Sequence, residues 1–174
     1  MHFAPDGTLL ISNGDGSHWE WPDDGIDRTP YDVECATIFG VAQDIGSLRS
    51  QDDDSMGGKI LRIDADTGNG IGPDNFPALV SNPYYDPANP YSARSRIWAK
   101  GFRNPFRFAS KLLWLLFLTY DFIKVRTDAG IGSDGIGTIL LSDVGYASFE
   151  EINIIKRGAN YGCKNIKNFL KIFQ

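Results

Sequence analysis

The chain has 174 residues, of which 42% are hydrophobic and 22% charged, as in an ordinary globular domain. Its formal net charge of −5 argues against a nucleic-acid partner, since a phosphate backbone rewards clustered Lys and Arg. The longest apolar run, around residues 112–123, falls short of the ~20 residues that span a bilayer, so a buried strand or helix is favoured over a membrane span.

Short β-rich runs alternate with Gly- and Asp-rich turns along most of the chain. The opening residues predict a turn entering a strand and not a signal peptide, so we expect the start to be internal to a longer protein. Residues 58–64 alternate apolar and polar side chains, which predicts one buried face. No segment before residue 110 has helical periodicity, and the fold class is therefore predicted to be all-β. In chain order, the predicted strands cover residues 8–12, 58–64, 95–100, 106–108, 138–142 and 151–155.

Three stretches of the chain break this pattern. Residues 16–56 form a long, strand-poor insertion, of the kind that is usually functional or disordered. Residues 111–124 are an atypical apolar insertion, and residues 164–174 form a tail of Lys, Asn, Ile, Phe and Leu. Because the composition of the last two stretches differs from that of the Asp- and Gly-rich sequence around them, we hypothesise that they are non-native insertions or read-through.

The cysteines and the acidic runs could each be part of a disulfide or a metal site, and the sequence favours simpler interpretations for the acidic runs. The two cysteines, Cys35 and Cys163, show no spacing typical of a zinc or redox motif, and their pairing is undetermined. The run of Asp residues at 52–54 favours a solvated loop over a metal site. Asp64 and Asp66 have the spacing that begins an EF-hand loop, but Asn75 stands where a bidentate Glu is required, which predicts a turn.

One segment is repeated within the chain. Residues 7–12 are echoed by residues 137–142, and each copy is followed by an Asp/Gly turn and later by an outer strand, at 59–63 and 151–155. Inner strand, turn and outer strand are the sequence signature of a propeller blade. At ~40–50 residues per blade, the chain is predicted to hold about two to three blades of four-stranded antiparallel sheet, an incomplete ring. Chance similarity between short strands is the alternative.

Four segments of the chain have the character of family motifs. They are F-A-P-D-G-T-L-L-I-S-N-G-D-G at 3–16, G-G-K-I-L-R-I-D at 57–64, R-I-W-A-K-G-F-R-N-P at 96–105, and S-D-V-G-Y followed by E-E-I-N and G-A-N-Y-G within 142–162. In this order they resemble the glucose/sorbosone dehydrogenase family. The resemblance implies that residues 1–163 form part of a six-bladed β-propeller that binds pyrroloquinoline quinone (PQQ) and calcium at one mouth of its channel. It also implies oxidation of C1 of an aldose sugar to a lactone.

By this resemblance, Arg103 is the catalytic and cofactor-binding residue, with Asn104 as a neighbouring cofactor contact. A guanidinium keeps its charge and donates a rigid fork of hydrogen bonds, so it can polarise a quinone carbonyl and stabilise the reduced anion. The alternative reading is that Arg103 pairs with an acid and braces the end of a strand.

The resemblance also implies a calcium site. Gly145 and Tyr146 would offer backbone carbonyls, Glu150 stands where the family has an acidic ligand, and Tyr161 matches the N-Y-G motif. Glu150 replaces an Asp, Tyr146 replaces a residue that is proline in some members, and Cys163 stands where tryptophan usually follows. A surface turn is the alternative reading of residues 145–150.

The family's catalytic histidine would precede Met1, and His2 lies too close to Phe3 to take its place, so we expect the chain to be inactive alone. The expected partners are the missing propeller blades and, in the full-length protein, a sugar substrate; export to an extracellular or periplasmic compartment is expected. Two other functions stay open: a non-catalytic propeller module for protein or carbohydrate binding, and a metal-dependent hydrolase of another six-bladed family. The expectation that decides among them is that Arg103 and the 145–150 turn share one axial pocket.

Overall fold

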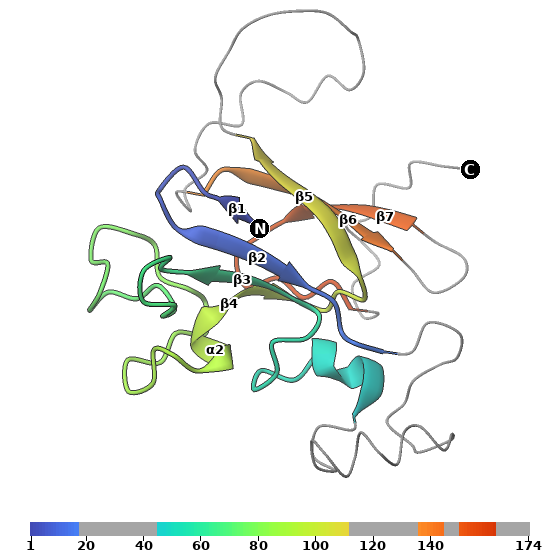
Figure 1. Cartoon of the computed structure of the whole chain (residues 1–174), viewed down its shortest axis with the longest axis horizontal. Helices are drawn as coiled ribbons and strands as arrows, with labels where there is room; N and C mark the ends of the chain where they lie inside the picture. Colours follow the sequence, from blue (N-terminus) through green and yellow to red (C-terminus); the bar gives the residue numbers. More distant parts are fainter. Residues whose placement is uncertain (18–44, 112–135, 145–149, 163–174) are drawn as a thin grey trace, which may run out of the picture.

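A computed structural model describes residues 1–17, 45–111, 136–144 and 150–162, which form two antiparallel β-sheets with little helix (Figure 1). The all-β prediction is therefore confirmed for these residues. The first sheet has the strand order β1 (His2–Phe3), β2 (Leu9–Asn13), β3 (Lys59–Ile63) and β4 (Ile97–Lys100). The second sheet has the order β5 (Pro105–Lys111), β6 (Thr138–Val144) and β7 (Glu150–Ile155). The helical elements are a 3-10 turn at Gly46–Ser50 and the one-turn helix α2 (Ala93–Arg96).

In both sheets every strand pairs with its neighbour in the sequence, so each sheet is a meander. The two copies of the repeated segment are β2 and β6, and each pairs with the outer strand expected from the sequence. Leu10 lies opposite Arg62 in the β2–β3 ladder, and Leu140 lies opposite Ile154 in the β6–β7 ladder. The predicted pairing of inner and outer strands is confirmed, and the described residues do not close into a ring.

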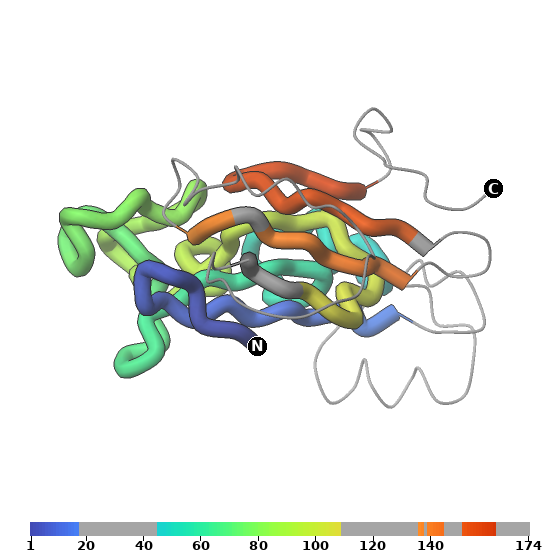
Figure 2. Tube along the Cα trace, turned by 90° about the horizontal axis from the view of Figure 1, so that it is seen from above, coloured from blue at the N-terminus to red at the C-terminus, as the bar shows by residue number. Residues whose placement is uncertain are grey.

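The hydrophobic core lies between the two sheets, which are stacked as adjacent layers (Figures 1 and 2). Because side chains alternate across a strand, every second residue of β2 and β6 faces this core. The buried cluster consists of Ala4, Leu10, Ile60, Trp98, Ala99, Phe102, Ile136, Ile139, Leu141 and Ile155.

Strand β3 differs from the sequence expectation, because both of its faces are buried. Lys59 and Arg62 are fully enclosed, alongside Ile60 and Leu61. The reason is that both cationic heads find partners. The Arg62 guanidinium, for example, donates hydrogen bonds to the Thr8 hydroxyl (3.0 Å) and to the Val80 carbonyl in the segment that follows β3 (2.6 Å). A strand with satisfied polar groups on its second face need not leave that face in water.

The strand predicted at residues 95–100 begins later, at Ile97, because Ser95 and Arg96 belong to helix α2. The hydroxyl of Ser92 accepts a hydrogen bond from the Ser95 amide (3.2 Å) and caps this single helical turn. The expectation of extended backbone at these two residues was therefore wrong.

Several sequence predictions fall outside the described residues. These are both cysteines, most of the 16–56 insertion, residues 112–124 of the apolar insertion, Gly145, Tyr146 and the 164–174 tail. Within the described ranges, no helix is long and apolar enough to cross a membrane.

Candidate functional site

One end of the molecule gathers the loops that carry the motif residues. In the first sheet, Asn13 lies opposite Lys59 and Lys59 opposite Lys100, so β2 ends, β3 begins and β4 ends at neighbouring positions. In the second sheet, Pro105 at the start of β5 lies opposite Asp143 near the end of β6. We call this region, with the loops attached to it, the site end.

The Arg103–Asn104 loop is fixed at the site end by a buried carboxylate. Oδ2 of Asp143 accepts a hydrogen bond from the Arg103 amide (3.1 Å), and Oδ1 accepts one from the Asn104 amide (2.7 Å). The Arg103 carbonyl in turn accepts a hydrogen bond from the Asp15 amide (2.9 Å). The peptide group between Arg103 and Asn104 is thus held at both its C=O and its N–H, and the preceding peptide group is held at its N–H.

The same loop lies beside the start of the predicted calcium turn. The amide of Val144, the last residue of β6, donates to the carbonyl of Asn104 (3.0 Å). Gly145 follows Val144 directly in the chain, and β7 returns at Glu150, opposite Val144. The structure therefore brings Arg103 and Asn104 next to the start of the 145–150 turn, with the Glu150 backbone one strand further across the sheet, while Gly145, Tyr146 and the Glu150 side chain lie outside the described residues.

Asp143 is the most unusual titratable group of the site end. Burial raises its pKa to about 6, against the opposing effect of the hydrogen bonds from Arg103 and Asn104, and the nearby charges of Glu151 and Asp15 raise it further. Sequence reasoning missed both Asp143 and Asp15. The available signal was an acid shortly after each copy of the repeated segment, at Asp15 three residues after the first copy and at Asp143 directly after the second. The sequence predicts a turn at 143–145, but Asp143 and Val144 belong to β6, which continues to Val144.

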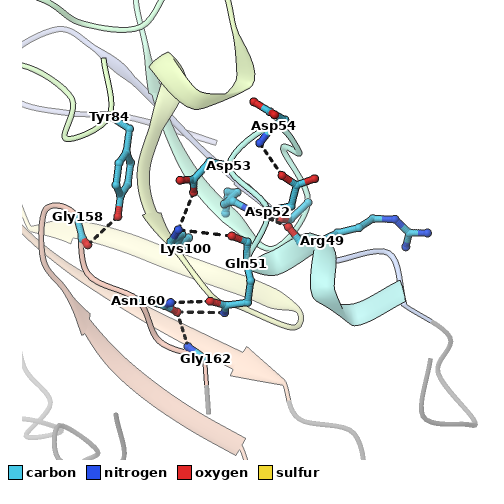
Figure 3. Close-up of polar contacts among 12 residues, drawn as sticks. Arg49, Gln51, Asp52, Asp53, Asp54, Tyr84, Lys100, Gly158, Asn160 and Gly162 are labelled. Carbon is cyan, nitrogen blue, oxygen red and sulfur yellow. Dashed lines mark hydrogen bonds and ion pairs between the residues drawn. The ribbon is translucent and has the colours of Figure 1, made fainter. Parts of the chain in front are cut away.

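A second set of polar contacts joins the Asp52–Asp54 loop to the N-Y-G segment (Figure 3). Nζ of Lys100 lies 2.6 Å from Oδ1 of Asp53 and donates to the Gln51 carbonyl (3.5 Å). The side-chain amides of Gln51 and Asn160 exchange two hydrogen bonds (3.1 and 2.6 Å), and Asn160 also accepts one from the Gly162 amide (3.0 Å).

Both acidic runs have local partners. Oδ1 of Asp52 accepts a hydrogen bond from the Asp54 amide (2.9 Å), and the three Asp side chains are partly or fully exposed, as predicted for a solvated loop. Oδ1 of Asp64 accepts one from the Asp66 amide (3.1 Å) and its carbonyl accepts one from Gly68 (2.8 Å), which confirms the predicted turn. Among the described residues, no group of three or more His, Cys, Asp or Glu side chains could hold a metal ion.

Tyr161 has contacts of a different kind from those of a metal ligand. Its ring stacks on Phe102 with centroids 5.0 Å apart. Its hydroxyl donates to the Ile154 carbonyl (2.7 Å) and accepts from the Lys156 amide (2.8 Å). Ile154 lies four residues along β7 from Glu150, a separation of about 13 Å in an extended strand. The Tyr161 hydroxyl and the Glu150 backbone are thus at different ends of β7.

Lys59 is fully buried at the site end, a position that its sequence pattern did not predict. Its ammonium donates to the carbonyls of Arg49 and Gly57, both at 2.7 Å, and so spans the loop that contains the three Asp residues. Burial lowers the pKa of Lys59 to about 8; the charge of Asp53 opposes this and the charge of Lys100 adds to it.

Because the pKa of Lys59 is lowered in the folded chain, the free energy of unfolding should depend on pH in the alkaline range. Between about 8 and the ordinary 10.5, the unfolded chain keeps a proton on Lys59 that the folded chain has lost, so the free energy of unfolding rises with pH. We expect urea denaturation to show a gain of roughly 1–2 kcal/mol between pH 8 and about pH 9.5. In Lys59→Met this slope should disappear; an unchanged slope in that variant would assign the effect to other groups.

Comparison with known proteins places this geometry in context. No family model matches the chain. It is 29% identical over 164 residues to the HIPL2 protein of Arabidopsis thaliana and 26% identical over the same length to the HIPL1 protein of that plant, covering 92% of this chain in each case. The chain spans only 17% of the length of these curated relatives. Among solved structures, it is similar to the PQQ-bound form of an aldose sugar dehydrogenase from Streptomyces coelicolor, at 22% identity and a TM-score of 0.49, over 95% of this chain and 29% of that one.

Proposed function

We propose that this chain is a sector of a PQQ- and calcium-dependent aldose dehydrogenase of propeller fold, and that it supplies Arg103 and Asn104 to the cofactor pocket. Four sequence segments in the order of the glucose/sorbosone dehydrogenases support this. The observation that carries it is the pair of hydrogen bonds from the Arg103 and Asn104 amides to Asp143, next to the beginning of the 145–150 turn. Two motifs that lie about 40 residues apart in sequence thereby meet at one end of the sheets.

The arrangement of the sheets supports the propeller part of the proposal. Two meanders pack face to face, and the outer face of the second sheet exposes Ile152 (36%) and Ile154 (54%) on β7. Apolar side chains side by side on a strand are typical of a face that another layer covers. In the proposal, a further sheet of the ring packs on this face.

The chemistry follows from the residue types. When bound, PQQ supplies an electrophilic quinone that accepts the hydride of the sugar's C1–H bond. The Arg103 guanidinium would donate hydrogen bonds to the cofactor oxygen where negative charge develops. Asn104, whose backbone is fixed beside it, would contact the cofactor through its side-chain amide. The proposal assigns no general base to the described residues.

Calcium is assigned by resemblance, to the carbonyls of Gly145 and Tyr146 and the carboxylate of Glu150, all hard oxygen donors. The backbone position of Glu150 fits this role, since it faces Val144 at the site end. Tyr161 takes a supporting role, since its hydroxyl is engaged by β7 and its ring packs against Phe102, directly before Arg103.

The test is a fluorescence titration of the purified chain with PQQ in the presence of calcium. Hydrogen bonds from a charged donor are worth about 1.5–3 kcal/mol, so Arg103→Met should weaken PQQ binding roughly 10- to 100-fold. Arg94→Met on helix α2, before the start of β4 and thus at the opposite end of the first sheet, removes the same charge and should leave the affinity unchanged. Absence of saturable binding to the wild-type chain would refute the cofactor role and favour a non-catalytic binding module.

A further inference from the structure

Asp143 has no role in the chemistry described above, yet it is buried and makes two directed contacts. The residue is 9% exposed, and each carboxylate oxygen accepts a hydrogen bond from one backbone amide, that of Arg103 (3.1 Å) or that of Asn104 (2.7 Å). Neither amide belongs to a strand, since β4 ends at Lys100 and β5 begins at Pro105. Without Asp143 these two donors would lose their partners inside the protein.

The contacts on the other side of the loop complete a backbone clamp. The Arg103 carbonyl accepts the Asp15 amide (2.9 Å), and the Asn104 carbonyl accepts the Val144 amide (3.0 Å). A Cβ atom added at Gly14 would lie 3.2 Å from the Arg103 carbonyl oxygen, so the neighbouring loop also approaches closely. With the peptide groups on both sides of its Cα fixed, Arg103 can project its side chain in only a narrow range of directions.

The clamp needs a carboxylate and no other side chain. An ionised Asp offers acceptors on both oxygens, whereas Asn would turn an NH₂ donor toward one of the two amides. A Glu would add a methylene and displace the carboxylate oxygens from these amides, whose loop leads directly into β5 at Pro105, opposite Asp143. The residue type is thus matched to two adjacent N–H groups, the arrangement of an anion-binding backbone nest.

We propose that Asp143 is a positioning residue that holds the backbone of Arg103 and Asn104 so that the Arg103 guanidinium meets the cofactor oxygen. The positioning of the cofactor contact rests on the proposed function, whereas the ordering of the loop does not. A site held within a fraction of an ångström needs such supporting contacts behind the residues that touch the ligand.

The first measurement is hydrogen exchange of the backbone amides by NMR, without any cofactor. In the wild-type chain, the Arg103 and Asn104 amides should be protected although they lie between strands, and fast exchange of both would overturn the proposal without any variant. In Asp143→Asn, exchange at these two amides should rise by about 10-fold or more. The matched control is Asp64→Asn, which alters an Asp-to-amide hydrogen bond in the turn after β3, far from the site end, and should leave both amides unchanged.

The second measurement is a double-mutant cycle on PQQ affinity. Asp143→Asn should weaken binding about 10-fold in the wild-type background and clearly less in Arg103→Met, because the part of its effect that acts through Arg103 is then lost and only the part through Asn104 remains. Equal effects in both backgrounds would indicate a general structural role and overturn the positioning role while leaving the proposed function standing. If the wild-type chain binds no PQQ, the proposed function fails, and the exchange rates alone decide whether Asp143 orders the loop.

Discussion

Replacing Arg62 with Met is expected to lower the free energy of unfolding by about 3–5 kcal/mol, the range for breaking a buried ion pair from one side. Arg62 is fully buried, and its guanidinium lies 4.8 Å from the Trp98 ring centroid. It pairs with the Asp6 carboxylate (2.5 Å) and also binds the Thr8 hydroxyl and the Val80 carbonyl. Met fills much of the volume but leaves these acceptors, including a carboxylate that is only 6% exposed, without their donor.

Urea denaturation of Arg62→Met and of Arg96→Met distinguishes the effect of losing a buried, paired guanidinium from the effect of losing one positive charge. Arg96 stacks on Tyr91, which is 63% exposed, at 3.6 Å from the ring centroid. An exposed contact of this kind is worth about 0.5–1 kcal/mol, so Arg96→Met should have a small effect. A loss below about 1 kcal/mol for Arg62→Met would show that Asp6 finds water when its partner is removed, and that the pair is not enclosed.

The strands could be predicted from sequence because their signals are local. Gly- and Asp-rich turns bracket β2, β3 and β6, and the repeated segment predicted which strands pair. The enclosed second face of β3 could not be predicted in this way. Burial of Arg62 depends on acceptors 54 and 18 residues away in the chain, at Thr8 and Val80, and no alternation within five residues of strand contains that information.

The residues of the candidate site also differ in whether local sequence or distant contacts define their role. Arg103 and Asn104 were predicted because they stand in a recognisable linear motif. Asp143 was missed because its role is to accept hydrogen bonds from backbone amides 40 and 39 positions earlier in the chain. Every residue except proline has such an amide, so the sequence does not show which amides need a partner. The Gln51–Asn160 pair joins side chains 109 positions apart, and either amide alone reads as an ordinary polar surface residue.

Gly58→Ala is expected to destabilise the chain by about 2–5 kcal/mol, mainly through steric conflict at the site end. Gly58 has φ +64°, where an L-residue costs about 1–2 kcal/mol. A Cβ atom there would also collide with the Ser50 side chain and with the Phe102 carbonyl oxygen, and overpacking of this kind adds about 1–3 kcal/mol. Neither neighbour can move easily, because the Gly101 and Phe102 amides both donate to the Gly58 carbonyl and the Gly101 amide also donates to the Ser50 carbonyl (3.1 Å each).

Gly7 provides the matched control, because it shares the backbone conformation without the crowding. It has φ +85°, and no atom lies within 4 Å of the position that a Cβ would take. Gly7→Ala should therefore cost only the conformational part, about 1–2 kcal/mol. The difference between the two variants in urea denaturation isolates the packing of the Gly58, Ser50 and Phe102 loops. Equal losses of unfolding free energy in the two variants would show that these loops rearrange to admit one methyl group. A site end with such mobile loops could not hold Arg103 in a fixed direction.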